Sequence, residues 1–275
     1  MSITNLLNIK YPIIQGAMAQ IAKAPLVAAV SNAGGLGIIA SGGMTADMLR
    51  EEIQKTKALT DKAFGVNLML MMTNIAELTE VIIEEKVGIV TTGAGTPKTF
   101  MPIWKEAGII VIPVVPSVMI AKRMEKMGAD AVIAEGTEAG GHVGETTTMA
   151  LLPQIVDAVT IPVIGAGGIA DGRGIVAALA LGAKGVQIGT RFLATDECPV
   201  HPDFKAAVIK ASDRDTLEEL TLGSLRKAVQ EGDTDNGSVM AGQIAGLITE
   251  IKPCKDVIEE MMTDAKKVIA GLELK

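Results

Sequence analysis

Short apolar runs alternate with amphipathic segments along most of the chain. The runs have the length of strands and lie at residues 11–15, 36–40, 63–70, 88–92, 109–115, 131–134, 162–166 and 185–188. Apolar residues at helical spacing occupy segments between them, as at residues 45–59, 76–86, 117–127 and 173–181. Parallel strands need such helical crossovers. Eight strands match a (β/α)8 TIM barrel, an α/β fold, whereas the alternative, a doubly wound sheet, more often has five or six.

The alternation changes after residue 195. A polar stretch at residues 195–203 is followed by helical material, a glycine-containing segment at 237–246 and an amphipathic helix at 253–270. Pro253 at the start of this last segment fits the preference of helix N-termini for proline. We therefore expect one structural unit, with a barrel core at residues 1–195 and a C-terminal helical region at 196–275 packed on it.

Composition supports a barrel and excludes several functions. Of the 275 residues, 48% are hydrophobic but only 2% are aromatic. This balance argues against an all-β sandwich and against an aromatic platform for nucleic-acid bases, and it suits a parallel sheet covered by helices. The net charge of -7 also argues against a partner with a phosphate backbone. We expect no nucleic-acid partner.

Membrane and metal sites are not expected either. No uninterrupted apolar run approaches the roughly 18 residues that span a bilayer, and residues 1–10 lack the pattern of a signal peptide. The two cysteines, Cys198 and Cys254, form neither a disulfide framework nor a metal-binding cluster with the two histidines. The sequence predicts a cytoplasmic protein with reduced thiols.

Glycine-rich loops follow the seventh and eighth predicted strands, where barrels of this type commonly bind phosphate. Gly167 and Gly168 precede a helix, and Gly189 and Thr190 follow the next strand. Tight turns also use glycine for purely structural reasons. The pairing of the two loops nevertheless favours phosphate binding, because backbone N–H groups at such loops donate hydrogen bonds to anions.

Other candidate side chains lie at the ends of predicted strands. His142, flanked by glycines, could supply a proton, although a lone histidine is usually structural. Glu135 could bind a ribose or ribityl hydroxyl or cap its loop, and Asn67 could contact a heterocycle edge or stabilise a turn. Met69, Met71 and Met72 could line an acyl groove, but core filling is the favoured interpretation. The residues predict a phosphate-anchored ligand near one histidine and do not identify it.

Several motifs resemble the nitronate monooxygenase superfamily of FMN-binding barrels. They are QGAMA at residues 15–19, AGGLGII at 33–39, FGVN at 64–67, AEG at 134–136, EAGGH at 138–142, GAGGIADG at 165–172 and QIGTRF at 187–192. Within this superfamily, residues 111–117, 142–149 and 237–243 are most similar to the flavin-dependent enoyl-[acyl-carrier-protein] reductases of the FabK type.

The resemblance implies FMN as the cofactor, NADH or NADPH as the reductant and enoyl-acyl carrier protein as the substrate. It also implies a homodimer without a metal site, and it makes His142 the residue that assists catalysis. The residues that it assigns to the cofactor site are Gly16, Ala17, Met18, Asn67, Glu135, Gly140, Gly141, Gly167, Gly168, Gly189, Thr190, Met240, Gly242 and Gln243. The phosphate would lie on Gly167, Gly168, Gly189 and Thr190.

The chain departs from the family in two places. It has Gly16 to Gln20 in the order GAMAQ, where family reductases usually carry Gly-Gly-Met-Ala-Trp. Between Asp215 and Thr221 it lacks a stretch that, in the family, belongs to a small lid over the substrate and nicotinamide, so the lid is expected to be shortened. The alternatives are a nitronate monooxygenase that uses FMN and O2, and a trimmed FMN-binding paralogue without turnover.

Overall fold

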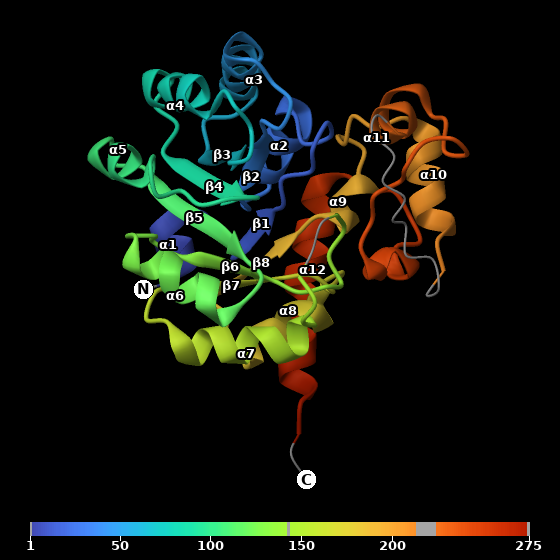
Figure 1. The fold of residues 1–275 in the computed structure, drawn as a ribbon. Coiled ribbons are helices and arrows are strands. Elements are labelled where there is room, and N and C mark those ends of the chain that lie inside the picture. Colours follow the sequence, from blue (N-terminus) through green and yellow to red (C-terminus); the bar gives the residue numbers. More distant parts are fainter. Residues whose placement is uncertain (1, 142–143, 213–223, 274–275) are drawn as a thin grey trace.

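Eight parallel strands form a nearly closed barrel in the computed structural model, which describes residues 2–141, 144–212 and 224–273 (Figure 1). The strands are β1 (Ile13–Gln15), β2 (Gly37–Ala40), β3 (Phe64–Met69), β4 (Ile89–Gly93), β5 (Ile110–Val115), β6 (Val132–Glu135), β7 (Val163–Ala166) and β8 (Gly185–Ile188). They are ordered β1-β8-β7-β6-β5-β4-β3-β2, and a parallel bridge between Ile14 and Leu36 joins the two ends. The predicted (β/α)8 TIM barrel is confirmed.

Helices between the strands cover the outside of the barrel. They are α2 (Ala24–Asn32), α3 (Ala46–Leu59), α4 (Ile75–Glu84), α5 (Met101–Glu106), α6 (Val118–Lys126), α7 (Thr148–Ala158) and α8 (Gly172–Ala180). Side chains fix several starting points: the Thr45, Ser117 and Asp171 oxygens accept backbone N–H bonds at the starts of α3, α6 and α8. Each of the eight predicted strands lies within two residues of its observed bounds.

The inside of the barrel is filled by branched aliphatic side chains. Ile14, Leu36 and Ile38 belong to this inner cluster, as do Ile112, Ile133 and Ile164 from the opposite strands. The short helix α1 (Ile3–Leu7) adds Ile3 and Leu7 to the same cluster, and a Cβ on Gly185, the first residue of β8, would lie 2.9 Å from Ile3. Because α1 closes the amino-terminal end of the strands, ligands have access from the carboxyl end.

The C-terminal part divides into an excursion and a final helix. The excursion contains α9 (Thr190–Leu193), α10 (Pro202–Lys210), α11 (Ser224–Arg226), the π-helix η1 (Lys227–Glu231) and the 3-10 helix η2 (Gln243–Leu247), and α10 and α11 stand beside the barrel (Figure 1). The last helix, α12 (Cys254–Gly271), packs against α8 and α2. It completes the outer layer of the barrel, although it follows residue 195 in the sequence. The predicted boundary between barrel core and C-terminal region at residue 195 stays a prediction.

Two further sequence-based expectations concern this part of the chain. The shortened segment between Asp215 and Thr221 lies outside the described residues. Within the described residues, none of the helices has the length and apolar character needed to cross a bilayer.

Candidate functional site

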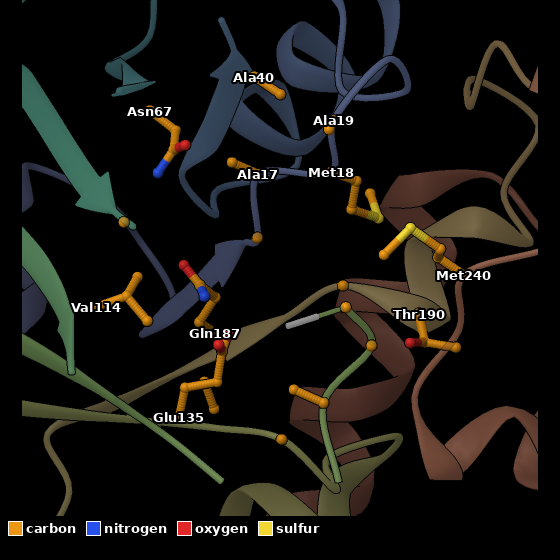
Figure 2. A pocket seen from close by; sticks show the side chains of 18 of the residues that line it. Ala17, Met18, Ala19, Ala40, Asn67, Val114, Glu135, Gln187, Thr190 and Met240 are labelled. Carbon is orange, nitrogen blue, oxygen red and sulfur yellow. The ribbon is translucent and has the colours of Figure 1, made fainter. Parts of the chain in front are cut away.

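A cavity of about 860 Å³ opens at the carboxyl ends of the strands (Figure 2). Its volume is near the upper end of the roughly 300–1,000 Å³ of small-molecule sites. Barrel enzymes carry their chemistry at this end, because all of the strand-to-helix loops meet there. We therefore treat this cavity as the candidate active site.

Nearly all of the predicted cofactor-binding residues line the cavity. Those that do so are Gly16, Ala17, Met18, Asn67, Glu135, Gly140, Gly141, Gly167, Gly168, Gly189, Thr190 and Met240. Met18, Thr190 and Met240 lie at one side of the opening, and Asn67 lies across from them (Figure 2). The structure thus brings together residues that are up to 224 positions apart, as the interval from Gly16 to Met240 shows. Their roles toward a cofactor stay predictions.

Gly242 and Gln243 do not line the cavity and instead support its wall. The Gly242 N–H donates to the Thr190 hydroxyl at 2.9 Å, and the Gln243 N–H donates to the Glu138 carbonyl at 2.9 Å. A Cβ on Gly242 would lie 2.5 Å from that carbonyl oxygen, so only glycine fits there. Through these two bonds, the excursion after β8 is attached to the loops after β6 and β8.

The loop after β7 has the backbone shape of an anion cradle. Gly167 and Gly168 have φ values of +92° and +72°, which side-chain-bearing residues rarely adopt. A Cβ on Gly167 would lie 2.9 Å from the Gly136 carbonyl oxygen and 3.0 Å from the Thr148 hydroxyl. Gly189 and Thr190 follow the adjacent strand β8, so the two loops are neighbours in the ring. This arrangement supports the predicted phosphate position.

Sequence reasoning missed the pair that holds this loop in place. The Glu138 carboxylate accepts a bond from the Thr148 backbone N–H at 2.9 Å and from the Thr148 hydroxyl at 2.8 Å, at the start of α7. The same hydroxyl lies 3.0 Å from the Gly167 carbonyl oxygen. Glu138 and Thr148 are ten positions apart in an irregular loop, and no periodic pattern in the sequence connects them.

Polar side chains replace aliphatic ones at the top of the barrel interior. Glu135 of β6 and Gln187 of β8 both pair with Ala166 of the strand between them, so their side chains share one face of the sheet. On the opposite strands the Asn67 amide donates to the Thr91 hydroxyl at 3.0 Å. The cavity therefore has a polar floor. Gln187 was absent from the predicted site, although a polar residue in an otherwise apolar strand was a signal for it.

Burial changes the acidity of Glu135. Removal of its carboxyl group from water raises the pKa from 4.5 to about 7. Of the described residues that line the cavity, Glu135 and Glu138 are the ones with ionisable side chains. Glu135 can therefore exchange a proton with a ligand near neutral pH.

Beyond the Asn67–Thr91 bond, toward the opening, the side of the cavity over β3 to β5 is apolar. Met69, Met71, Val114 and Ile120 line it, together with the backbone of residues 93–95. Core filling was the favoured interpretation of the methionines and is wrong for Met69 and Met71, which line the cavity. Met69 is the last residue of β3, and Met71 lies in the loop after it and is 71% exposed. Met72 is partly buried and packs against the core, as expected.

The two histidines have different outcomes. His142 lies outside the described residues, so its catalytic role stays a prediction; Gly141 and Gly144 on either side of it line the cavity. His201 caps α10, where its Nδ1 atom accepts a bond from the Asp203 N–H at 3.2 Å. His201 therefore has a structural role at the start of this helix.

The residues present fit FMN. The glycine cradle at β7 and β8 offers N–H donors for its phosphate, and the amides of Asn67 and Gln187 offer donors and acceptors for ribityl hydroxyls and the ring edge. The cavity also exceeds what a phosphate alone would need. The glycines whose Cβ positions are blocked let the loops of the cavity wall pack closely against one another.

Comparisons with known proteins agree with this site. The sequence profile described as nitronate monooxygenase matches residues 1–80 and 72–221. FabK from Thermotoga maritima is 47% identical with a TM-score of 0.95, over 98% of this chain and 97% of that one. A probable nitronate monooxygenase of Staphylococcus saprophyticus is 40% identical, over 78% of this chain and 74% of its own length.

A third relative has a different name. The (3aS,4S,5R,7aS)-5-hydroxy-7a-methyl-1-oxo-octahydro-1H-indene-4-carboxyl-CoA dehydrogenase of Rhodococcus jostii is 34% identical, over 98% of this chain and 97% of its own length. These proteins share a family, although their names describe different activities. From the matched profile, the relatives and the glycine-lined cavity together, the chain belongs to the nitronate monooxygenase family of FMN-dependent oxidoreductases.

Proposed function

We propose that the protein reduces trans-2-enoyl thioesters of acyl carrier protein with NADH or NADPH, through FMN. The observation that carries the proposal is a cavity with a polar, glycine-lined side and an apolar side large enough for a second ligand. The likeness to FabK, an enoyl-ACP reductase, over nearly the whole chain supports the same activity. The name of the Rhodococcus relative also includes a thioester of coenzyme A.

The residues of the cavity would bind the cofactor and cover it. Bound FMN would supply the hydride-transfer chemistry between the reduced nicotinamide and the β carbon of the enoyl thioester. Gly167, Gly168 and Gly189 would hold the phosphate through backbone N–H groups, with Thr190 beside them. The methionines Met18 and Met240 would close the space above the cofactor, because both line the mouth of the cavity (Figure 2).

The reaction also needs one proton for the α carbon. His142 is the predicted donor, and its neighbours Gly141 and Gly144 line the cavity. Glu135 is a second source, because a carboxyl group with a pKa of about 7 is protonated in half of the molecules near neutral pH. The balance is enoyl thioester plus NAD(P)H plus a proton giving acyl thioester plus NAD(P)⁺. We further propose that the enzyme works as a homodimer.

Nitronate oxidation is the second candidate. It is favoured by the matched family profile and by the name of the Staphylococcus relative. A nitronate of a small nitroalkane is compact, however, and would leave the apolar side of the cavity largely unfilled. The two activities can be separated because only the reductase needs NAD(P)H and an enoyl thioester.

The test compares both reactions on one preparation. Under argon, we expect crotonyl thioesters of acyl carrier protein and of coenzyme A to be reduced at the expense of NADH or NADPH, with the saturated product identified by mass spectrometry. In air and without nucleotide, we expect ethyl nitronate to be consumed at least about 100-fold less efficiently, since discrimination by a site of different shape and polarity reaches this size. The reverse order would overturn the proposal.

A further inference from the structure

We infer that the apolar side of the cavity over β3 to β5 binds the acyl chain of the substrate, and that Gly93 sets the chain length accepted. We call this side the acyl arm; its lining residues are Met69, Met71, Gly93, Val114, Pro116 and Ile120. The inference rests on the proposed function, because it specifies which enoyl thioesters that reaction uses.

The position of the acyl arm leaves the phosphate loops free. In the ring of strands, β4 is separated from β8 by β7, β6 and β5 on one side and by β1, β2 and β3 on the other. It is therefore opposite β8, where Gly189 and Thr190 lie. A ligand in the acyl arm and a phosphate at β7 and β8 occupy opposite sides of the same opening.

The chemistry of the acyl arm suits a hydrocarbon chain. Its side chains are uncharged, and the ionisable residues among the described lining, Glu135 and Glu138, belong to β6 and the loop after it. Among the described lining residues of the acyl arm, the pyrophosphate of a nicotinamide nucleotide would find no cation to pair with. Methionine side chains adapt to flexible apolar ligands, and Met71 and Met69 contribute two of them.

Neither packing nor backbone geometry requires glycine at position 93. It is the last residue of β4, and it lies two residues after Thr91 on the same face as the Asn67–Thr91 hydrogen bond. A Cβ built on Gly93 meets nothing within 4 Å, and its φ lies outside the left-handed region. By contrast, a Cβ on Gly65 of β3 would lie 2.8 Å from Ile38, so that glycine serves packing.

An exposed apolar side chain marks the outer end of the acyl arm. Met71 lines the cavity and is 71% exposed. A large apolar side chain left in water at the mouth of a cavity is consistent with a surface that a ligand covers. A chain that passes Gly93 would reach solvent beside Met71.

The test replaces Gly93 with valine and compares it with a matched control. Gly88, at the start of the same segment and at the other end of the barrel, is exposed, and a Cβ there also meets nothing within 4 Å. Gly88→Val therefore makes the same chemical change without touching the cavity. For each holoenzyme we would measure kcat/KM for 2-butenoyl and 2-dodecenoyl thioesters of coenzyme A. Calorimetry would give the Kd of butyryl-CoA and dodecanoyl-CoA.

We expect Gly93→Val to lower kcat/KM for the twelve-carbon substrate at least about 10-fold and to change it for the four-carbon substrate less than about threefold. Each methylene kept out of the acyl arm is worth about fourfold. The Kd of dodecanoyl-CoA should rise in parallel, and Gly88→Val should leave every value within about twofold. Thermal melting and flavin content would verify that both variants fold.

The outcomes separate the inference from the proposed function. An equal loss for both chain lengths, or no loss in Gly93→Val, overturns the inference while the reductase stands. If the unmodified enzyme reduces no enoyl thioester, the proposed function fails and the binding data decide. In that case, weaker dodecanoyl-CoA binding in Gly93→Val alone supports the acyl arm, and equal binding in all three proteins overturns it.

Discussion

Glu135 is a carboxyl group that lies directly above the aliphatic cluster inside the barrel. It follows Ile133 on the inner face of β6, and Ile133 belongs to the aliphatic cluster that fills the barrel. A buried charge is costly, so the folded protein favours the protonated form and the pKa rises to about 7. The location of this residue therefore couples stability to pH.

This coupling gives a prediction for Glu135→Gln in FMN-free protein. The pKa of Glu135 in the folded protein is above the usual value of 4.5. The contribution of this carboxyl group to the free energy of unfolding is therefore complete below pH 4.5 and is lost as pH rises through about 7. The unmodified protein should therefore lose free energy of unfolding between pH 4.5 and pH 8. The variant, whose side chain cannot ionise, should lose about 3 kcal/mol less over the same range. Urea unfolding at both pH values measures it. Glu80→Gln, at an exposed position, is the control; identical pH profiles for the Glu135 variant and the unmodified protein would contradict the burial argument.

The two histidines offer a matched pair for testing the catalytic assignment. We expect His142→Ala to lower turnover with an enoyl thioester by about 10² to 10⁴, the usual contribution of an acid or base, while FMN is retained. His201→Ala removes an imidazole that caps α10 and should leave turnover within about twofold. Steady-state rates and flavin absorbance would measure both. Turnover unchanged in His142→Ala would make His142 structural and leave Glu135 as the proton source.

At the scale of elements, the backbone shape of the loop after β7 determines whether FMN phosphate can bind at its predicted position. Gly167→Ala would force a side chain into a φ of +92° and against the Gly136 carbonyl and the Thr148 hydroxyl. Gly128→Ala makes the same change at a φ of +96°, where a Cβ meets nothing within 4 Å. The left-handed conformation costs alanine about 1–2 kcal/mol at either site.

We expect the two variants to differ in FMN affinity. Gly167→Ala should weaken FMN at least about 10-fold and riboflavin, which lacks the phosphate, less than about threefold, because the loop faces the phosphate. Gly128→Ala should leave both affinities unchanged. Fluorescence titration with the two flavins measures this difference. Equal weakening of FMN and riboflavin in Gly167→Ala would argue that the phosphate lies elsewhere.

Helix α12 is predicted to contribute to the stability of the barrel itself. A Cβ on Gly172 of α8 would lie 2.3 Å from the Ala265 nitrogen, so α8 and α12 are in close contact. Ile258→Ala, at a fully buried site on α12, should lower the free energy of unfolding by about 2–5 kcal/mol. Ile269→Ala, at a site 57% exposed on the same helix, should lower it by less than about 1 kcal/mol. Chemical denaturation followed by circular dichroism would measure both, and a separate early transition for α12 would contradict the prediction.

At the scale of the whole molecule, the barrel was predictable because its evidence is periodic. Buried parallel strands give apolar runs such as residues 109–115, and each run is followed by a helical pattern. The paired loops at Gly167 and Gly189 were predictable for the same reason, since strand order fixes their neighbourhood. Their assignment to FMN came from the resemblance in motifs and not from the periodicity.

Contacts between distant segments were beyond sequence reasoning. The Glu138–Thr148 pair and the bond from Gly242 to Thr190 join irregular loops, where no pattern indicates a partner. Periodicity also shows only that a residue faces inward. It could not tell that Met69 faces a cavity and Met72 the packed core, because that depends on where the strand ends.

The most direct test of the account is a visible spectrum of the purified protein under anaerobic conditions. We predict flavin absorbance bands that bleach when NADH or NADPH is added and return when a crotonyl thioester follows. Bands that bleach and return only with oxygen would contradict the reductase. A colourless protein that takes up no added FMN would contradict the cofactor site on which the account depends.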